Sequence, residues 1–220
     1  ALFNDRAFNG RFTLSAVNSI NWARLMAQIV YYFYTAVRLG APDRPIAYSV
    51  PTGNFGDVFA GYVAERMGLP IERLIVATNV NDILHRALTT GDYSCGTVTA
   101  TATPSMDIQV SSNFERLLFD LAGRDGPTLA GMMAGFESSR AMQIPAPMIA
   151  GAKDLFTSAR IDATAMADAM RWAAERTGQI IDPHTAIGLA AARSAGLPAD
   201  VPVYRPADRG ICGQFGRVLR

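Results

Sequence analysis

The residues best suited to bind a ligand lie in a glycine-bearing turn, Thr52-Gly-Asn-Phe-Gly-Asp57. The turn follows a short apolar run, Ile46-Ala-Tyr-Ser-Val50, and precedes a helix-forming segment. Gly53 and Gly56 allow backbone N–H groups to approach a ligand closely, and a helix N-terminus adds donors and partial positive charge. This pattern favours an anion site, most often one for phosphate. It is neither a Walker A loop nor a GxGxxG motif, and an ordinary strand-to-helix turn is the alternative.

A second polar set, Ser19, Asn21 and Arg24, stands at the start of an earlier helical segment. The guanidinium of an arginine presents a planar fork of donors that suits phosphate, and serine and asparagine add neutral hydrogen bonds. Ser19 and Arg24 are separated by little more than one helical turn, so these side chains can converge at the helix start. The alternative is a capping serine, a polar asparagine and a surface arginine.

The chain has few groups for other chemistry. Lys153 is its only lysine, although Lys and Arg together number 20. Cys95 and Cys212 stand far apart, and with His85 and His184 they form no disulfide framework and no zinc motif. We therefore expect no metal site, and we interpret the two histidines as packing or solvent-exposed residues.

Composition predicts a folded protein without a nucleic-acid or membrane partner. Of the 220 residues 50% are hydrophobic and 18% charged, which favours a packed core. The net charge of +1 gives no support for nucleic-acid binding. The longest apolar stretch, around 29–34, is far shorter than the roughly 20 residues that span a bilayer. The chain begins Ala-Leu-Phe without Met or a signal peptide, so we expect a cytoplasmic location and a longer parent chain.

Hydrophobic periodicity predicts the elements that position these residues. Residues 18–39 are predicted to form a helix capped by Asn18 or Ser19 and, being apolar nearly all round, buried between layers. Residues 46–78 have the length and pattern of a βαβ unit, which implies a parallel sheet covered by helices. Further helices are expected at 82–88, 113–123, 161–176 and 183–195, with a long ordered loop over 89–112 and a last strand from 201.

Polar residues at two further places have an open interpretation. Asn79, Asn81 and Asp82 follow a predicted strand, where they either line a ligand cleft or cap the next helix. Ser111-Ser-Asn113 is most simply interpreted as a cap of the helix that follows it.

Several blocks resemble one family, and they do so in the same order along the chain. Ser49-Val-Pro-Thr-Gly-Asn-Phe-Gly-Asp57 resembles the phosphate loop of threonine synthases, which are pyridoxal-phosphate enzymes of fold type II. The similarity extends over roughly residues 1–203. The other similar blocks are Val17-Asn-Ser-Ile-Asn-Trp-Ala-Arg24, Gln28-Ile-Val-Tyr-Tyr-Phe33, Ala77-Thr-Asn-Val-Asn-Asp82, Met106-Asp-Ile-Gln-Val-Ser-Ser-Asn-Phe-Glu-Arg116 and Ile181-Asp-Pro-His-Thr-Ala186.

The resemblance implies a fold, a cofactor and a substrate. The fold is the three-layer α/β large domain of a fold-type-II enzyme, incomplete in this chain. The cofactor is pyridoxal 5'-phosphate, whose phosphate would be held mainly by backbone N–H groups of Gly53, Asn54, Phe55 and Gly56. The substrate is O-phosphohomoserine, whose phosphate would be bound by Ser19, Asn21 and Arg24. The implied reaction eliminates phosphate and adds water to give L-threonine.

The resemblance also implies that one reactive group is absent. The Schiff-base lysine of the family lies in a Phe-Lys-Asp motif before the phosphate loop, whereas Lys153 follows the loop, in Ala152-Lys-Asp-Leu-Phe156. We therefore assign no catalytic residue in this chain and expect the lysine upstream of it. The chain alone is expected to be inactive. The alternatives are a non-catalytic α/β module that binds a phosphometabolite, and a truncated product that folds poorly.

The C-terminal end departs from the family pattern. Residues 1–203 are predicted to form part of the catalytic region, mostly the large domain, and 204–220 an atypical tail. The family would continue with Ala-Thr-Ala-His-Pro-Ala-Lys-Phe, which this sequence lacks. We hypothesise a frameshift at this point, and an uninterrupted reading frame on resequencing the gene would refute it. Strands missing from the sheet would leave an open edge that is prone to aggregate.

Overall fold

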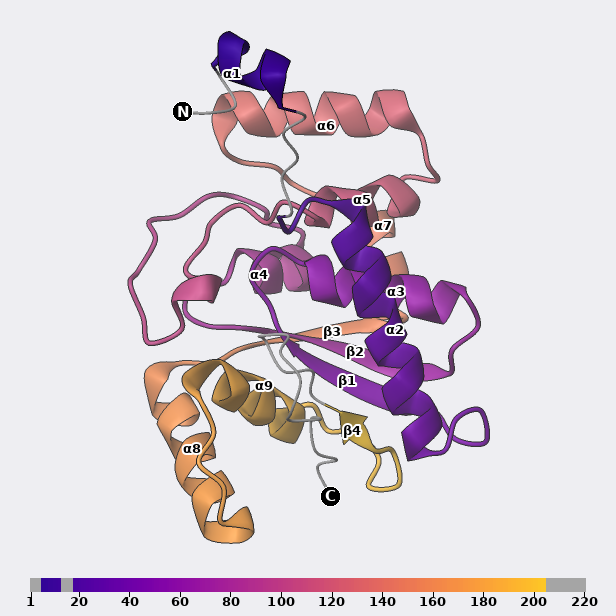
Figure 1. The fold of residues 1–220 in the computed structure, drawn as a ribbon, viewed down its shortest axis with the longest axis vertical. Coiled ribbons are helices and arrows are strands. Elements are labelled where there is room, and N and C mark those ends of the chain that lie inside the picture. Colours follow the sequence, from indigo (N-terminus) through magenta and orange to yellow (C-terminus); the bar gives the residue numbers. More distant parts are fainter. Residues whose placement is uncertain (1–4, 13–17, 205–220) are drawn as a thin grey trace.

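The computed structural model describes residues 5–12 and 18–204. Its centre is a parallel four-stranded sheet in the order β3-β2-β1-β4 (Figure 1). The strands are β1 (Ile46–Pro51), β2 (Ile71–Thr78), β3 (Phe156–Arg160) and β4 (Val203–Tyr204). Tyr204 is thus part of the sheet, and the rest of the predicted tail, 205–220, lies outside the described residues.

Helices lie on both faces of the sheet, so the fold has three layers, as predicted (Figure 1). The helices are α1 (Arg6–Arg11), α2 (Trp22–Leu39), α3 (Gly56–Arg66), α4 (Ile83–Thr90), α5 (Phe114–Leu121), α6 (Gly126–Ser139), α7 (Ala146–Lys153), α8 (Ala163–Thr177) and α9 (Pro183–Ser194). One face carries α3, α4 and α7, and the other carries α9. Outside these, α2 packs on α3 and α8 packs on α9. Among the described residues, no helix is long and apolar enough to cross a bilayer.

Side chains of β1 and β2 alternate between two cores, because successive strand residues point to opposite faces of a sheet. Tyr48 and Val50 belong to the core on the α3 side. Ala47 and Ile75 belong to the core on the α9 side. Every residue of β1 is buried, so the apolar run 46–50 is explained by burial on both faces.

The predicted strand-turn-helix-strand unit is confirmed, and so is the start of α9. Asp182 is the N-cap of α9, and its carboxylate accepts the Thr185 N–H at 3.1 Å. Pro183 is the first helical residue, where its missing N–H costs nothing. The long loop after α4 is also confirmed; it contains one short 3₁₀ helix, η2 (Pro104–Met106).

Two predictions about α2 are wrong. Its N-cap is Asn21, whose Oδ1 accepts the Ala23 N–H at 2.9 Å, and not Asn18 or Ser19. The Asn18 side chain instead accepts the Ile20 N–H at 3.1 Å and stabilises the turn before the helix. The helix is also not buried between layers, because only one side of it packs on α3 and apolar side chains such as Val30 and Val37 are exposed.

The elements expected from the sequence do not include α1, β3, α6 or α7. The sequence of β3 is Phe-Thr-Ser-Ala-Arg, and only its first residue is fully buried. A strand at the edge of the sheet buries less surface than β1, so it lacks the continuous apolar run that identifies a central strand.

Candidate cofactor and substrate site

The glycine-bearing turn lies at the carboxyl edge of the sheet, between the end of β1 and the start of α3. Phe55 adopts a left-handed backbone conformation with φ 62°, which residues other than glycine rarely take. Its buried ring packs on the rings of Phe114 and Phe156, with centroid distances of 5.2 and 6.0 Å. This packing offsets the backbone strain and holds the turn in one conformation.

Gly53 is required by the close approach of a distant segment. A Cβ at this position would lie 2.4 Å from the carbonyl oxygen of Ser105, in η2. Since the obstacle is backbone rather than the end of a flexible side chain, no larger residue fits without moving η2 or the turn.

The carbonyl groups of the turn are held by the Ser111–Asn113 segment. The hydroxyl of Ser111 donates to the Gly53 oxygen at 2.9 Å. Asn113 donates twice to the Asn54 oxygen, from its backbone N–H at 3.1 Å and from Nδ2 at 3.0 Å. The simplest interpretation from sequence, that these residues cap the next helix, is corrected: Asn113 is the N-cap of α5 but makes no side-chain cap hydrogen bond. The sequence shows three polar residues before a helix and cannot show which carbonyl groups they reach.

Fixing these carbonyl groups also fixes the donors of the turn. In a trans peptide the C=O and the next N–H point in opposite directions. The N–H groups of Asn54 and Phe55 therefore point away from the Ser111–Asn113 segment, and no hydrogen bond within the described residues uses either of them. The N-cap of α3 is Phe55, which supplies no side-chain acceptor. Backbone donors and a helix N-terminus without a side-chain cap thus meet at one place, and this arrangement fits a phosphate.

The Ser19–Arg24 segment lies beside the turn. Nδ2 of Asn113 donates to the Ser19 oxygen at 2.8 Å as well as to Asn54, so one buried side chain contacts both segments. Arg116 adds a second link, because it donates to the Ile20 oxygen at 2.9 Å and to Oδ1 of Asn113 at 3.0 Å. These hydrogen bonds hold the backbone of the segment and do not involve its side chains.

The three candidate phosphate ligands of this segment have different surroundings. Ser19 is half-buried in the turn before α2. Asn21 uses its Oδ1 as the N-cap of α2, so its Nδ2 is the atom that suits an anion. Arg24 lies in the first turn of α2 with an exposed side chain.

Lys153 lies at the opposite edge of the sheet from the turn. It is the last residue of α7, and its Nζ donates to the Thr89 oxygen at 3.3 Å. Arg73, near the start of β2, donates to the Lys153 oxygen at 3.0 Å, which fixes this lysine at the amino edge. A strand of the length of β1 separates the two edges by roughly 15–20 Å. The amine of Lys153 therefore cannot reach a ligand held by the turn.

Asn79 and Asn81 hold the long loop across the carboxyl edge. Asn79 donates from Nδ2 to Thr101, Thr103 and Asp107 at 3.0, 2.8 and 2.7 Å. Asn81 donates from Nδ2 to Asp107 at 3.0 Å. Burial disfavours a charge on Asp107, yet the hydrogen bonds from Thr101 and Asn79 outweigh it and lower the pKa of this carboxyl. Of the two roles left open for these asparagines, lining a cleft is the one the structure supports for Asn79.

A cavity of about 230 Å³ lies beside this loop. Asn79 and residues 99–103 form one side of it, and Asp162, Met166 and Ile187 form the other. It therefore opens at the same edge of the sheet as the turn, next to polar groups from the loop.

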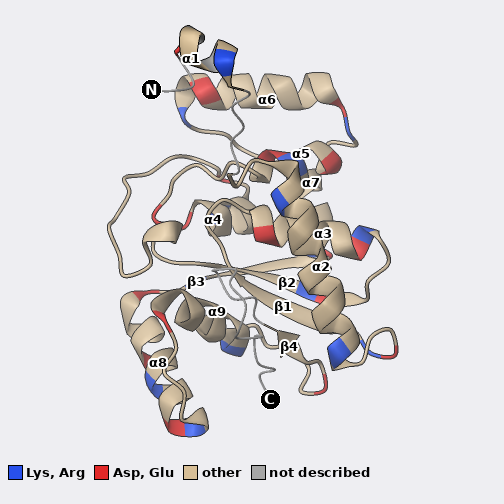
Figure 2. Cartoon of the chain, viewed as in Figure 1, with Lys and Arg blue, Asp and Glu red and all other residues tan. Residues whose placement is uncertain are grey.

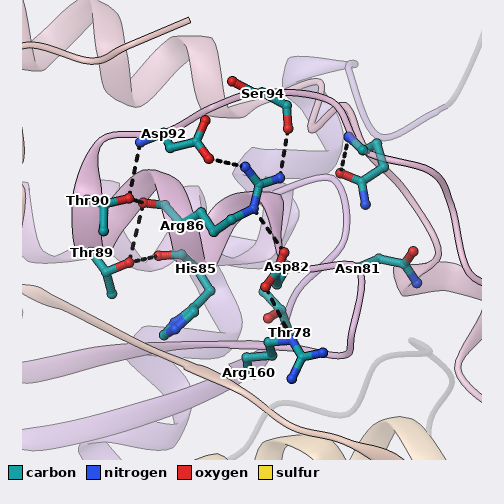
Figure 3. A network of polar contacts seen from close by, with 12 residues as sticks. Thr78, Asn81, Asp82, His85, Arg86, Thr89, Thr90, Asp92, Ser94 and Arg160 are labelled. Atoms are coloured by element: carbon teal, nitrogen blue, oxygen red, sulfur yellow. Dashed lines mark hydrogen bonds and ion pairs between the residues drawn. The ribbon is translucent and has the colours of Figure 1, made fainter. Parts of the chain in front are cut away.

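Asp82 belongs to a separate ionic network (Figure 3). It is the N-cap of α4 without a side-chain cap hydrogen bond, and it pairs with Arg86 at 3.0 Å and Arg160 at 3.2 Å. Arg86 also contacts the carboxylate of Asp92 and donates to the Ser94 oxygen at 2.7 Å. The network ties the ends of β2 and β3 to the start of the long loop, which is a structural role.

The histidines occupy positions of packing residues, as interpreted from the sequence. Nδ1 of His85 lies 2.9 Å from the Ser158 hydroxyl, and burial lowers its pKa. Nδ1 of His184 lies 3.7 Å from the Asp182 carboxylate at the start of α9. Across residues 5–12 and 18–204, no cluster of three or more His, Cys, Asp or Glu could hold a metal ion.

The sheet order, the layers and the turn after β1 define the class of protein: this is the α/β fold of the fold-type-II pyridoxal-phosphate enzymes. The structure of maize serine racemase has this fold, with a TM-score of 0.51 at 18% identity, a similarity that concerns the fold alone. No family model matches the chain.

Closer similarities define the particular protein. A threonine synthase structure from Brucella melitensis with bound PLP superposes with a TM-score of 0.88 at 48% identity, over 93% of this chain and 44% of that one. The threonine synthase of Pseudomonas aeruginosa is 50% identical over 92% of this chain and 43% of its own length. That of Saccharomyces cerevisiae is 42% identical over 87% of this chain and 40% of its own length. The chain is a homologue of threonine synthase, and it spans less than half the length of these relatives.

Proposed function

We propose that this chain contributes the cofactor-phosphate site of a threonine synthase. Backbone N–H groups of Gly53, Asn54, Phe55 and Gly56 would hold the phosphate of pyridoxal 5'-phosphate. The observation that carries the proposal is the set of hydrogen bonds from Ser111 and Asn113, which turns the carbonyl groups of the turn to one side and its donors to the other. When bound, the cofactor supplies an electron sink for the reaction.

The substrate proposed for the complete site is O-phosphohomoserine. Its phosphate would be bound by the hydroxyl of Ser19, Nδ2 of Asn21 and the guanidinium of Arg24. Support comes from the position of the segment, whose backbone is joined to the turn through Asn113. An arginine near this point can bind a phosphate by two parallel hydrogen bonds. The overall reaction would release phosphate and add water to form L-threonine.

The amine that the reaction needs would come from outside these 220 residues. Lys153 is the one lysine of the sequence, and it lies at the amino edge of the sheet. We therefore expect this chain alone to bind the cofactor without a covalent bond and to have no turnover. The same observation supports a second candidate function, a non-catalytic module that binds a phosphometabolite.

The first experiment is an absorbance titration with pyridoxal phosphate, followed by borohydride reduction and peptide mapping. We expect saturable binding that inorganic phosphate displaces, with no label on Lys153. Gly53→Ala should abolish the binding, because its Cβ would clash with Ser105. Gly135→Ala is the matched control, since a Cβ at that position meets nothing within 4 Å. Equal binding by both variants, or a label on Lys153, would contradict the proposal.

The two candidate functions differ in what completes them. The enzyme hypothesis predicts threonine formation when the missing part of a relative is supplied, for example from the Pseudomonas aeruginosa threonine synthase. The module hypothesis predicts phosphometabolite binding that this addition leaves unchanged, and no threonine.

A further inference from the structure

Helix α2 has apolar side chains on two faces, and those of the outer face are exposed at three positions. The inner face packs on α3 through Leu25, Tyr32 and Ala36, which are at most 1% exposed. The other face carries three exposed apolar side chains, which we call the outer stripe: Met26 at 53%, Val30 at 61% and Val37 at 65% exposed.

The outer stripe is unusual for a helix that faces water. Such a helix normally carries charged and polar residues on its solvent side. The only charged residues of α2 are Arg24 near its start and Arg38 near its end, and it has no acidic residue. In Figure 2 the helix is mostly tan, on the outside of α3. An exposed apolar row on a helix without acidic residues favours an interaction site, although its area alone does not require one.

The length of the relatives points to one kind of partner. Threonine synthases that match over 86–93% of this chain have more than half of their own length outside the match. We propose that the outer stripe of α2 is the docking surface for that remaining part of a threonine synthase chain. The docking segment would present apolar side chains to Met26 and Val30, because these two side chains would then be buried in a core.

A second copy of this chain fits the stripe less well. Two α2 helices packed antiparallel about a two-fold axis through the stripe would bring Arg24 of one copy near Arg38 of the other, with no acidic residue on either helix to pair with them. A stripe of three side chains also offers a few hundred Å² at most, whereas a stable dimer needs about 800 Å² from each partner. A longer segment of chain can add contacts elsewhere, because it is not limited to the stripe.

The test is a binding measurement with the missing part of the chain. This protein, carrying an affinity tag, is co-expressed with the part of the Pseudomonas aeruginosa threonine synthase that lies outside the match. We expect a stoichiometric complex, and we expect Val30→Glu to weaken it at least tenfold. Ile180→Glu is the matched control, because Ile180 is 93% exposed and lies between α8 and α9, away from the stripe. Circular dichroism confirms that each variant is folded.

Three outcomes would overturn the inference. One is that no complex forms between two expressed and folded parts. Another is that Val30→Glu and Ile180→Glu bind equally well. The third is a homodimer of the unmodified chain that Val30→Glu dissociates, which would assign the stripe to a second copy. None of these readouts requires cofactor binding, so the inference and the proposed function can fail separately.

Discussion

The two phosphate-binding candidates, the Gly53–Gly56 turn and the Ser19–Arg24 segment, are held in different ways. The turn has its carbonyl groups fixed by side chains, its Phe55 ring buried and its Gly53 against the backbone of η2. The Ser19–Arg24 segment is held through two backbone oxygens and the Trp22 ring, which contacts Phe59 and Arg116, while its Arg24 side chain is exposed.

Folding therefore orders the donors of the turn completely, whereas it orders those of the Ser19–Arg24 segment only in part. In the turn, the donors are backbone N–H groups, so their directions follow from the packing of the chain. In the segment, the donors are side chains, which keep rotamer freedom until a ligand or another part of the protein fixes them. We infer that the turn contributes a preorganised anion site, whereas the segment depends on what lies next to it in a complete enzyme.

The largest effect is expected for Gly53→Ala. The added Cβ forces either η2 or the turn to move, which we expect to cost about 2–4 kcal/mol of unfolding free energy. Urea denaturation measures this cost, and Gly135→Ala is expected to be neutral or slightly stabilising. If Gly53→Ala unfolds at the same urea concentration as Gly135→Ala, the turn is not held by η2.

Asn113→Ala should weaken both regions at once. It removes the side-chain donor of the Ser19 oxygen and leaves the Asn54 oxygen with only the backbone N–H of residue 113, at a cost of about 2–3 kcal/mol. Phosphate affinity at the turn should fall at least tenfold in the same variant. Ser112→Ala is the comparison variant, because Ser112 makes only a long hydrogen bond of 3.3 Å to the side-chain Oδ1 of Asn54 and does not hold its backbone oxygen. Similar losses in the two variants would show that Asn113 has no special role.

Arg24→Gln should leave the turn and the stability unchanged. The side chain is exposed, so the unfolding free energy is expected to change by less than about 0.5 kcal/mol. Binding of pyridoxal phosphate should be equal to that of the unmodified chain. Only the binding of O-phosphohomoserine should weaken, and calorimetry on the enzyme completed with the missing part of a relative measures this. Arg38→Gln is the charge-matched control. A loss of cofactor binding in Arg24→Gln would mean that the two regions are not separate.

The smallest effect on stability is expected from lowering the pH. The pKa of Asp107 lies below its ordinary value of 3.8 in the folded chain, so the unfolded chain binds this proton more readily. Its contribution to stability is therefore present above about pH 4 and is lost as the pH falls through the folded pKa. Asp107 anchors the loop that carries Ser105, so acid should loosen the turn before the Ser19–Arg24 segment. Hydrogen exchange between pH 6 and pH 3 measures the order, and Asp107→Asn should remove the pH dependence.

The sequence by itself determined the features that depend on local rules. The buried run before Pro51, the glycine-bearing turn and the Asp182-Pro183 helix start each carry a signal within a few residues, and the structure has all three. Periodicity also sufficed for the βαβ unit, because strand and helix patterns differ over this length.

The tertiary structure decided everything that depends on which distant groups meet. Ser111 and Asn113 resemble ordinary caps in sequence, but their partners lie more than fifty residues away. The same is true of Lys153, whose distance from the turn follows from the direction of β3, an edge strand without an apolar pattern. For α2, periodicity predicts an apolar helix but cannot show that α3 covers one face and leaves the outer stripe exposed. A hydrogen bond or a packed face needs two partners, and the sequence around one partner does not identify the other.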